Sequence, residues 1–328
     1  MFHEVIEETL RRLKADNKGI LAADESVTSL ERKFFPLGIE NTEKNRLAYR
    51  SLFLTTQDIE KYIAGVILHE ETFGQSIDGL SIPAYLSQRS VVPGIKVDGG
   101  LVPFEGDEQV TAGLDVFAQK APQFFEAGAR FTKWRAVYQI SAATPSDGLV
   151  AESVRLLAQY AATSLKNGLV PIVEPEVLMD GDHDADACFT CTARVLKALF
   201  KALTSEGVEL SHVILKINMI VPGRDSTKQL SEDDVAEKTA RCLSESVPDE
   251  IPLVVFLSGG QSEEASTRHM AKVVQQIQAP WRITFSYGRA LQDSAIRSWC
   301  GHEENLSQGQ KAFFKRAEEN AKASMGRL

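Results

Sequence analysis

The sequence lacks the features that mark several large classes of protein. Its four cysteines among 328 residues are too few for a disulfide framework, which favours a reducing cytoplasm over a secreted location. No apolar run approaches the roughly 20 residues of a membrane-spanning helix, so we expect no membrane association. The formal net charge of −9 also argues against nucleic acid as a partner.

Motifs for common cofactors are scarce as well. No G-x-G and no G-x-x-x-x-G-K-[ST] occurs in the chain, so the usual dinucleotide and nucleoside-triphosphate fingerprints are absent. Six histidines leave little for a catalytic metal centre, and we expect no metal and no other cofactor. Cys188 and Cys191 form one C-x-x-C without a second pair, a pattern that favours two thiols on an ordinary helix over a zinc site.

Short apolar runs alternate with longer amphipathic stretches along the whole chain. Helical spacing marks residues 115–127, 147–168, 232–246 and 262–277, and also the N-terminal segment, whose apolar residues share one helical face. Eight runs read as buried strands, at residues 19–25, 62–70, 91–97, 129–137, 169–175, 212–220, 251–258 and 282–288.

This alternation predicts an α/β protein in which parallel strands are joined by crossover helices. Eight such units close a (β/α)8 TIM barrel, and 328 residues leave room for extra N- and C-terminal helices around it. We therefore expect one domain over residues 1–328. An open doubly wound sheet is the alternative, and its glycine fingerprint is missing.

Charged residues interrupt the predicted strands where a barrel interior should be apolar. Lys216, for example, lies near the centre of the apolar run at 212–222, although an unpaired buried ammonium is costly. Because active sites of this fold lie at the C-terminal mouth, charges late in five strands favour a catalytic pocket over a purely structural ion-pair network. These charged residues are Asp24, Lys96, Lys133, Arg135, Glu174 and Lys216.

Side chains of a strand alternate between its two faces. Glu176 should therefore share the inward face with Glu174, and Asn218 should share it with Lys216. A lysine beside other cations loses its proton more readily, and a neutral amine can attack a carbonyl to form a Schiff base. We expect Lys216 to play this part, with Glu174 moving protons and Asp24 accepting a hydroxyl proton as a carbon–carbon bond breaks.

Two glycine-containing loops follow the last two predicted strands, where this fold commonly binds phosphate. LSGGQSEE at 257–264 and FSYGRALQ at 285–292 each run from a strand end into a helix start, and the second adds Arg289. Backbone N–H groups in such loops can hold an anion. A second anion site is expected at 26–33, which offers Ser26, Ser29, Arg32 and Lys33, unless the hydroxyls only cap a helix.

The sequence resembles the class I fructose-1,6-bisphosphate aldolases from residue 19 to at least residue 292. The segments that carry the resemblance occur in the family's order, and they are GILAADES, GIKVD, KWR, PIVEPE, DGDHD, LK-NM, FLSGGQSEE and TFSYGRALQ. The resemblance implies a metal-independent lyase that cleaves fructose 1,6-bisphosphate in glycolysis and gluconeogenesis, and a homotetramer. A transaldolase-like Schiff-base enzyme, and a scaffold protein on a retained barrel, are the alternatives.

The resemblance also implies individual roles. Lys216 matches the family's Schiff-base lysine. Glu174 matches the residue that acts as acid and base in the dehydration step, and Glu176 lies beside it in the pocket. Asp24 matches the base that takes the C4-hydroxyl proton, and Lys133 supports it. Substrate contacts fall on three groups: the C1-phosphate residues Ser258, Gly259, Ser286, Gly288 and Arg289; the cations Lys96 and Arg135; and, near the distal phosphate, Ser26, Ser29, Arg32 and Lys33.

The sequence departs from the family pattern in three places. Ile217 follows the lysine where proline is common, and the basic pair near the distal phosphate reads Arg32-Lys33 instead of Lys-Arg. Many members extend into a tail that ends in tyrosine, whereas this sequence ends in KASMGRL. We therefore expect slower enamine protonation, or a substitute for the tyrosine.

Overall fold

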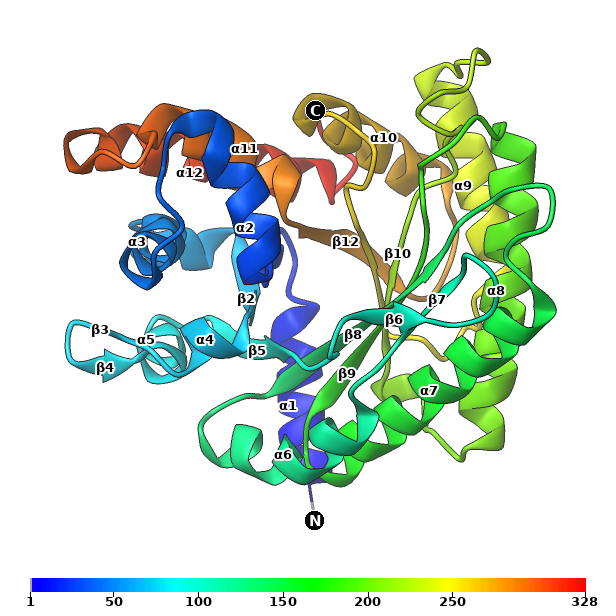
Figure 1. Ribbon diagram of the computed structural model, residues 1–328, viewed down its shortest axis with the longest axis horizontal. Coiled ribbons are helices and arrows are strands. Elements are labelled where there is room, and N and C mark those ends of the chain that lie inside the picture. The colour runs from blue at the N-terminus through cyan, green and yellow to red at the C-terminus, as the bar shows by residue number, and fades with distance from the viewer. Residues whose placement is uncertain (1) are drawn as a thin grey trace.

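In the computed structural model, which describes residues 2–328, eight parallel strands close into a barrel (Figure 1). All eight strands predicted from the sequence are present, and their closure excludes the open sheet. Each new barrel strand pairs with the previous one until β12 meets β1. The bounds are Gly19–Ala23 (β1), Ile63–Leu68 (β2), Val92–Lys96 (β5), Phe131–Tyr138 (β8), Val170–Val177 (β9), Ile214–Ile217 (β10), Leu253–Phe256 (β11) and Arg282–Tyr287 (β12).

Helices surround the barrel between successive strands (Figure 1). Serine side chains fix where several begin: Ser146, Ser231 and Ser262 each accept a backbone N–H three residues on, which satisfies an otherwise unpaired donor. The helices are Val27–Phe34 (α2), Glu43–Leu54 (α3), Glu70–Phe73 (α4), Ile82–Gln88 (α5), Leu114–Glu126 (α6), Asp147–Lys166 (α7), Ala185–Ser205 (α8), Glu232–Ser246 (α9), Glu263–Gln276 (α10), Arg289–Trp299 (α11) and Leu306–Ala323 (α12). Short 3-10 turns are Phe35–Leu37 (η1), Ile59–Lys61 (η2), Leu210–His212 (η3) and Glu303–Asn305 (η4).

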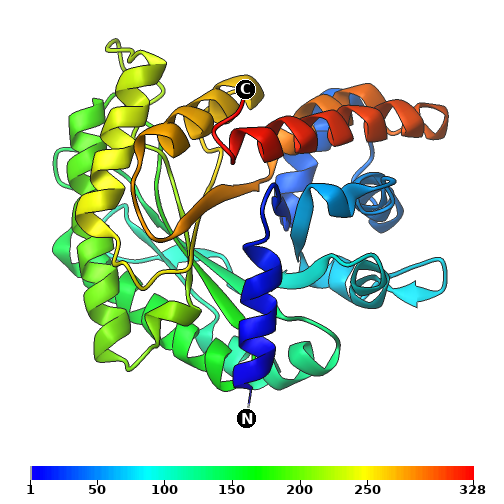
Figure 2. The same ribbon diagram turned by 180° about the vertical axis from the view of Figure 1, so that it is seen from behind.

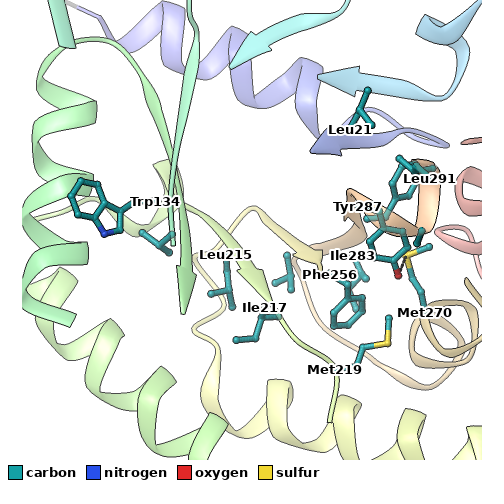
Figure 3. Close-up of a cluster of buried hydrophobic side chains, with 14 of the residues drawn as sticks. Leu21, Trp134, Leu215, Ile217, Met219, Phe256, Met270, Ile283, Tyr287 and Leu291 are labelled. Atoms are coloured by element: carbon teal, nitrogen blue, oxygen red, sulfur yellow. Dashed lines mark hydrogen bonds between the residues drawn. The ribbon is translucent and has the colours of Figure 1, made fainter. Parts of the chain in front are cut away.

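The strands bury apolar side chains on both faces because their residues alternate. Leu215 and Ile217 of β10 point outward and join the large cluster between barrel and helices, drawn in Figure 3 with Trp134 and Phe256. Ile214 points inward and joins a smaller cluster in the lower barrel. The other inward strand residues of that cluster are Ile20, Ala22, Ile67, Val92, Phe131, Val170, Ile172, Leu253 and Val255.

Helix α1 (His3–Leu13) closes the lower end of the barrel. Its buried residues Ile6, Leu10 and Leu13 belong to the inner apolar cluster, as the one-sided helical pattern predicts. Figure 2, seen from behind, shows α1 on the face of the barrel away from the β6–β7 hairpin labelled in Figure 1. The inner apolar residues therefore form a floor, and the charged side chains of the inward strand faces lie toward the other end.

Two hairpins were not predicted. Strands Ser76–Ile77 (β3) and Leu80–Ser81 (β4) form one, and Leu101–Pro103 (β6) and Gln109–Thr111 (β7) form the other. Strands of two or three residues are too short to show a period-2 pattern, which is why the sequence did not indicate them. Within residues 2–328, no helix combines the length and the apolar character needed to cross a bilayer.

A glycine inside the barrel makes room for an aromatic ring. A Cβ atom at Gly94 would overlap the ring of Phe131, which fills the inner face of the neighbouring strand. We expect Gly94→Ala to lower the free energy of unfolding by about 1–3 kcal/mol, because the packed floor cannot absorb an added methyl group. Urea denaturation measures this loss.

The matched control is Gly74→Ala at the end of α4. Its added Cβ would make only ordinary contacts, the closest at 3.6 Å, and its φ of −83° suits alanine. Equal stability of the Gly94→Ala and Gly74→Ala proteins would contradict this account of the floor.

Candidate active site

A pocket of about 470 Å³ opens at the end of the barrel that α1 leaves free. Every charged residue predicted late in a strand lines it, together with Glu176. The β6–β7 hairpin contributes Leu101 and Thr111 to its wall. The inward face of each strand therefore changes from apolar to charged on the way to the mouth: in β8, Phe131 is followed by Lys133 and Arg135.

The strand register sets the height of these side chains. Pairing of Ile214 with Ile172 brings Lys216 level with Glu174, two residues further along each strand. Lys133 pairs with Lys96, the last residue of β5. The expectation that Lys133 lies late in its strand is wrong, since β8 continues five residues beyond it to Tyr138.

Glu174 links the two central lysines. Its Oε1 lies 3.0 Å from Lys216 Nζ and its Oε2 lies 2.9 Å from Lys133 Nζ. Lys133 Nζ also donates to Asp24 Oδ2 at 3.0 Å. These four side chains are at most 11% exposed, so opposite charges alternate in a chain away from solvent. The direct charged neighbour of Lys216 is thus a carboxylate, not another cation as expected from the sequence.

Burial and charge act in opposite directions on this chain. Burial alone would raise the pKa of Asp24, but the ammonium groups of Lys133, Lys216 and Lys96 hold the pKa well below its ordinary value. Burial is likewise outweighed at Glu174, where Lys133, Lys216 and Arg135 lower the pKa. For Lys133, Asp24 and Glu174 outweigh burial and raise the pKa well above its ordinary value. Asp24 and Glu174 are therefore carboxylates at neutral pH, and Lys133 is an ammonium.

Two further ion pairs hold cations at the edge of the pocket. Arg135 Nε donates to Glu176 Oε2, and Lys96 Nζ lies 2.6 Å from Asp98 Oδ1. Both cations line the pocket, with side chains 37% and 19% exposed. Both cations are therefore accessible to a ligand in the pocket.

The predicted C1-phosphate residues come together on one side of the pocket. Ser258, Gly259, Ser286, Gly288 and Arg289 all line it, and α11 begins at Arg289. The hydroxyl of Ser286 is buried and has no hydrogen-bond partner among the described residues. A buried hydroxyl without a partner is costly, so this oxygen is suited to an incoming ligand. A side chain at Gly259 would meet Glu176 Oε1 at 2.9 Å, which accounts for the glycine.

The second predicted anion group is only partly correct. Ser26, Ser29 and Lys33 line the pocket, whereas Arg32 is exposed outside it. The spacing explains the difference, because residues three and seven positions after Ser26 share its face of α2. Lys33 Nζ donates to Glu25, Tyr49 and Gln292 at 2.9–3.1 Å. Of the basic pair, Lys33 is the one that reaches the pocket.

The prediction for Asn218 is wrong. It follows the last residue of β10 and is buried outside the pocket, where its Oδ1 accepts Val177 N–H and its Nδ2 donates to Thr192. The strand ends at Ile217, and with it ends the strict alternation on which the prediction relied.

Sequence reasoning also missed lining residues within its own motifs. Glu25, next to Asp24, and Gln292, at the end of GRALQ, hold Lys33, while Asp98 holds Lys96. Asp98 lies two residues after the predicted cation Lys96, and Glu25 and Gln292 lie within the predicted motifs. This closeness in the sequence could have indicated them as lining residues. Cys188 and Cys191 lie on α8, and burial raises the pKa of their thiols to about 11 and about 12. They are protonated at neutral pH, as expected of ordinary helix residues.

The fold and the pocket define a (β/α)8-barrel protein with a buried lysine at the centre of a charged mouth. The family model for class I fructose-bisphosphate aldolase matches residues 5–328. A probable class 1 fructose-bisphosphate aldolase of Xylella fastidiosa is 44% identical over 328 residues, covering 99% of this chain and 98% of that protein. The cytosolic fructose-bisphosphate aldolase 4 of Arabidopsis thaliana is 46% identical over 313 residues, covering 94% and 80%.

A solved structure agrees with these relatives. The aldolase of Plasmodium falciparum, in complex with TRAP and a small-molecule inhibitor, superimposes with a TM-score of 0.96 at 42% identity, covering 99% of this chain and 95% of that one. The chain belongs to the class I fructose-bisphosphate aldolase family, whose members are lyases of the metal-independent, Schiff-base type. The family acts on phosphorylated sugars.

The low pKa of Asp24 couples the site to acid stability. A carboxylate whose pKa is lowered in the folded state stabilises the protein above its unfolded-state pKa, and this contribution is lost as the pH falls. Between about pH 5 and pH 3, wild-type protein should lose about 1 kcal/mol more of its unfolding free energy than Asp24→Asn does. Urea denaturation at each pH measures the difference.

The control for this comparison is Glu126→Gln on the exposed surface of α6. It should keep the wild-type pH profile. An Asp24→Asn protein with the wild-type profile would show that the Lys133 ion pair has no effect on acid stability.

Proposed function

We propose that Lys216 forms the Schiff base by which this aldolase cleaves fructose 1,6-bisphosphate to dihydroxyacetone phosphate and glyceraldehyde 3-phosphate. The observation that carries the proposal is the contact of Lys216 Nζ with Glu174 Oε1 at 3.0 Å in a buried pocket. Proton transfer across this contact leaves a neutral amine, which adds to the C2 ketone and gives a carbinolamine.

Glu174 is placed to carry out the dehydration that follows. Once it has taken the lysine proton, it is a carboxylic acid beside the new carbinolamine hydroxyl, and it can return a proton as water leaves. The product is an iminium ion, which withdraws electrons from C3. Lys133, on the other carboxylate oxygen at 2.9 Å, favours return of Glu174 to the anionic form.

Asp24 is the base for the bond-breaking step. Its low pKa keeps it ionised, and it lines the same pocket as Lys216. It takes the proton of the C4 hydroxyl while the C3–C4 bond breaks, and the electron pair of that bond moves onto the iminium to form an enamine. Glyceraldehyde 3-phosphate leaves. Protonation of the enamine at C3 and hydrolysis then release dihydroxyacetone phosphate and regenerate the lysine.

Two groups of anion-binding residues support a bisphosphate substrate. We assign the C1 phosphate to the loops with Ser258, Ser286 and Arg289, since the Ser286 hydroxyl has no protein partner. Ser26, Ser29 and Lys33 of the α2 segment take the distal phosphate, and Lys96 and Arg135 bind between the two groups of residues. A transaldolase-like enzyme needs no second phosphate site, so this arrangement favours the aldolase.

We infer the remaining properties from the family and the fold. Residues 1–328 act as one domain, because α1 and α12 both pack on the same barrel. Catalysis needs no metal, because the iminium withdraws the electrons that a metal would otherwise withdraw. The cytosolic relative from Arabidopsis supports a cytoplasmic location, and the family resemblance supports a homotetramer.

Borohydride trapping tests the assignment of Lys216. Reduction in the presence of dihydroxyacetone phosphate should convert the iminium into a stable secondary amine, and peptide mapping should place it on Lys216. We expect Lys216→Met to abolish trapping and to lower kcat by at least about 10⁴-fold. Lys201→Met, an exposed position on α8, is the matched control and should behave as wild type. An adduct on Lys133, or no adduct at all, would contradict the mechanism.

A further inference from the structure

We propose a transition-metal site on the face of the barrel opposite to the catalytic pocket, made by His3, Glu7 and His212. One ligand atom from each of these side chains lies within 4.8 Å of the others. His3 and Glu7 are four residues apart and therefore share one face of α1. His212 ends η3, which packs beside α1 and leads into β10.

His212 is already oriented as a metal ligand would be. It is 5% exposed, and its two ring nitrogens meet different carboxylates: Nε2 lies 2.8 Å from Glu7 Oε1, and Nδ1 lies 3.3 Å from Glu209 Oε2. An Nδ1–H held by Glu209 leaves the Nε2 lone pair directed toward Glu7 and His3. Metal-binding histidines commonly have such a carboxylate on the second nitrogen, because it fixes the tautomer and the ring orientation.

The ligand set selects the kind of ion. Two imidazoles and one carboxylate form a three-ligand zinc set that leaves one position for water. Imidazole nitrogens favour Zn²⁺ and neighbouring ions such as Co²⁺ over Mg²⁺ or Ca²⁺, which prefer oxygen. The carboxylates of Glu7 and Glu209 both contact the ring of His212. A divalent ion at this site would also offset their negative charges.

Small movements of exposed side chains complete the site. The ring centroids of His3 and His212 are 5.4 Å apart, and the side chains of His3 and Glu7 are both exposed.

The expected role is structural. Glu7 and His212 are 205 residues apart in the chain, and a shared ion would fasten the helix that closes the barrel floor to the turn before the strand of Lys216. A ligand that binds only the folded protein stabilises it in proportion to its occupancy. The site contributes nothing to the aldol chemistry, because His3, Glu7 and His212 do not line the catalytic pocket.

Metal binding is tested on the full-length chain without an affinity tag. After treatment with EDTA and its removal, the protein should bind one Zn²⁺ by calorimetry and show the visible absorption of tetrahedral Co²⁺. Saturating Zn²⁺ should raise the melting temperature by several degrees, Mg²⁺ should not, and kcat should be the same with and without Zn²⁺.

Exposed positions provide variants that keep the fold. His3→Gln and Glu7→Gln should each weaken Zn²⁺ binding at least about tenfold and remove the rise in melting temperature. His3→Gln should melt as wild type does when no metal is present. Glu4→Gln, exposed on the same helix, is the matched control and should bind as wild type. Unchanged Zn²⁺ affinity in His3→Gln and Glu7→Gln, or no stoichiometric binding to wild type, would overturn the proposal.

Discussion

The interior of this barrel holds two lysine side chains because one carboxylate, Glu174, contacts both of them. Burying three charged groups is expensive, and their mutual attraction offsets that cost only where the contacts are close. Asp24 extends the chain by pairing with Lys133. The same contact that makes Lys216 tolerable in a buried position also gives its proton an acceptor, so stability and chemistry depend on one carboxylate.

The rest of the fold holds these charged side chains above the apolar floor of the barrel, at its C-terminal mouth. Apolar residues fill the lower barrel, α1 covers it from below, and a glycine at position 94 leaves space for Phe131. Charged residues begin one step above this floor on the same strand faces, and they line the pocket. A rigid, dry base under a charged mouth keeps the lysine and its carboxylate in fixed positions, which is what covalent catalysis requires.

The apolar runs of the sequence carried most of the predictable information, because they indicated the eight barrel strands. The alternation of side chains within those strands then placed the charges at 133, 174 and 216 on the inward face, where they converge at the mouth. Where the chain leaves regular structure, the same reasoning failed. Asn218 turns away once β10 has ended, and the short β6–β7 hairpin carries no periodic pattern.

Contacts between distant segments could not be predicted either. The choice of Lys33 over Arg32 depends on where α2 begins and on Gln292 from α11. The bridging position of Glu174 depends on strand register, since Lys133 and Lys216 come from the strands on either side of it. The cluster of His3, Glu7 and His212 brings together residues of α1 and η3, and Glu7 and His212 are 205 residues apart in the chain. No local sequence motif therefore indicates it.

The central claim is that Glu174 both stabilises the buried lysines and moves the proton of Lys216. The most direct test measures kcat and the unfolding free energy of Glu174→Gln together, with Glu176→Gln at the more exposed Arg135 pair as the control. We predict for Glu174→Gln a kcat lower by about 10²- to 10⁴-fold and a loss of about 3–5 kcal/mol in stability, both larger than in the control. A Glu174→Gln protein that unfolds and turns over like wild type would contradict the account.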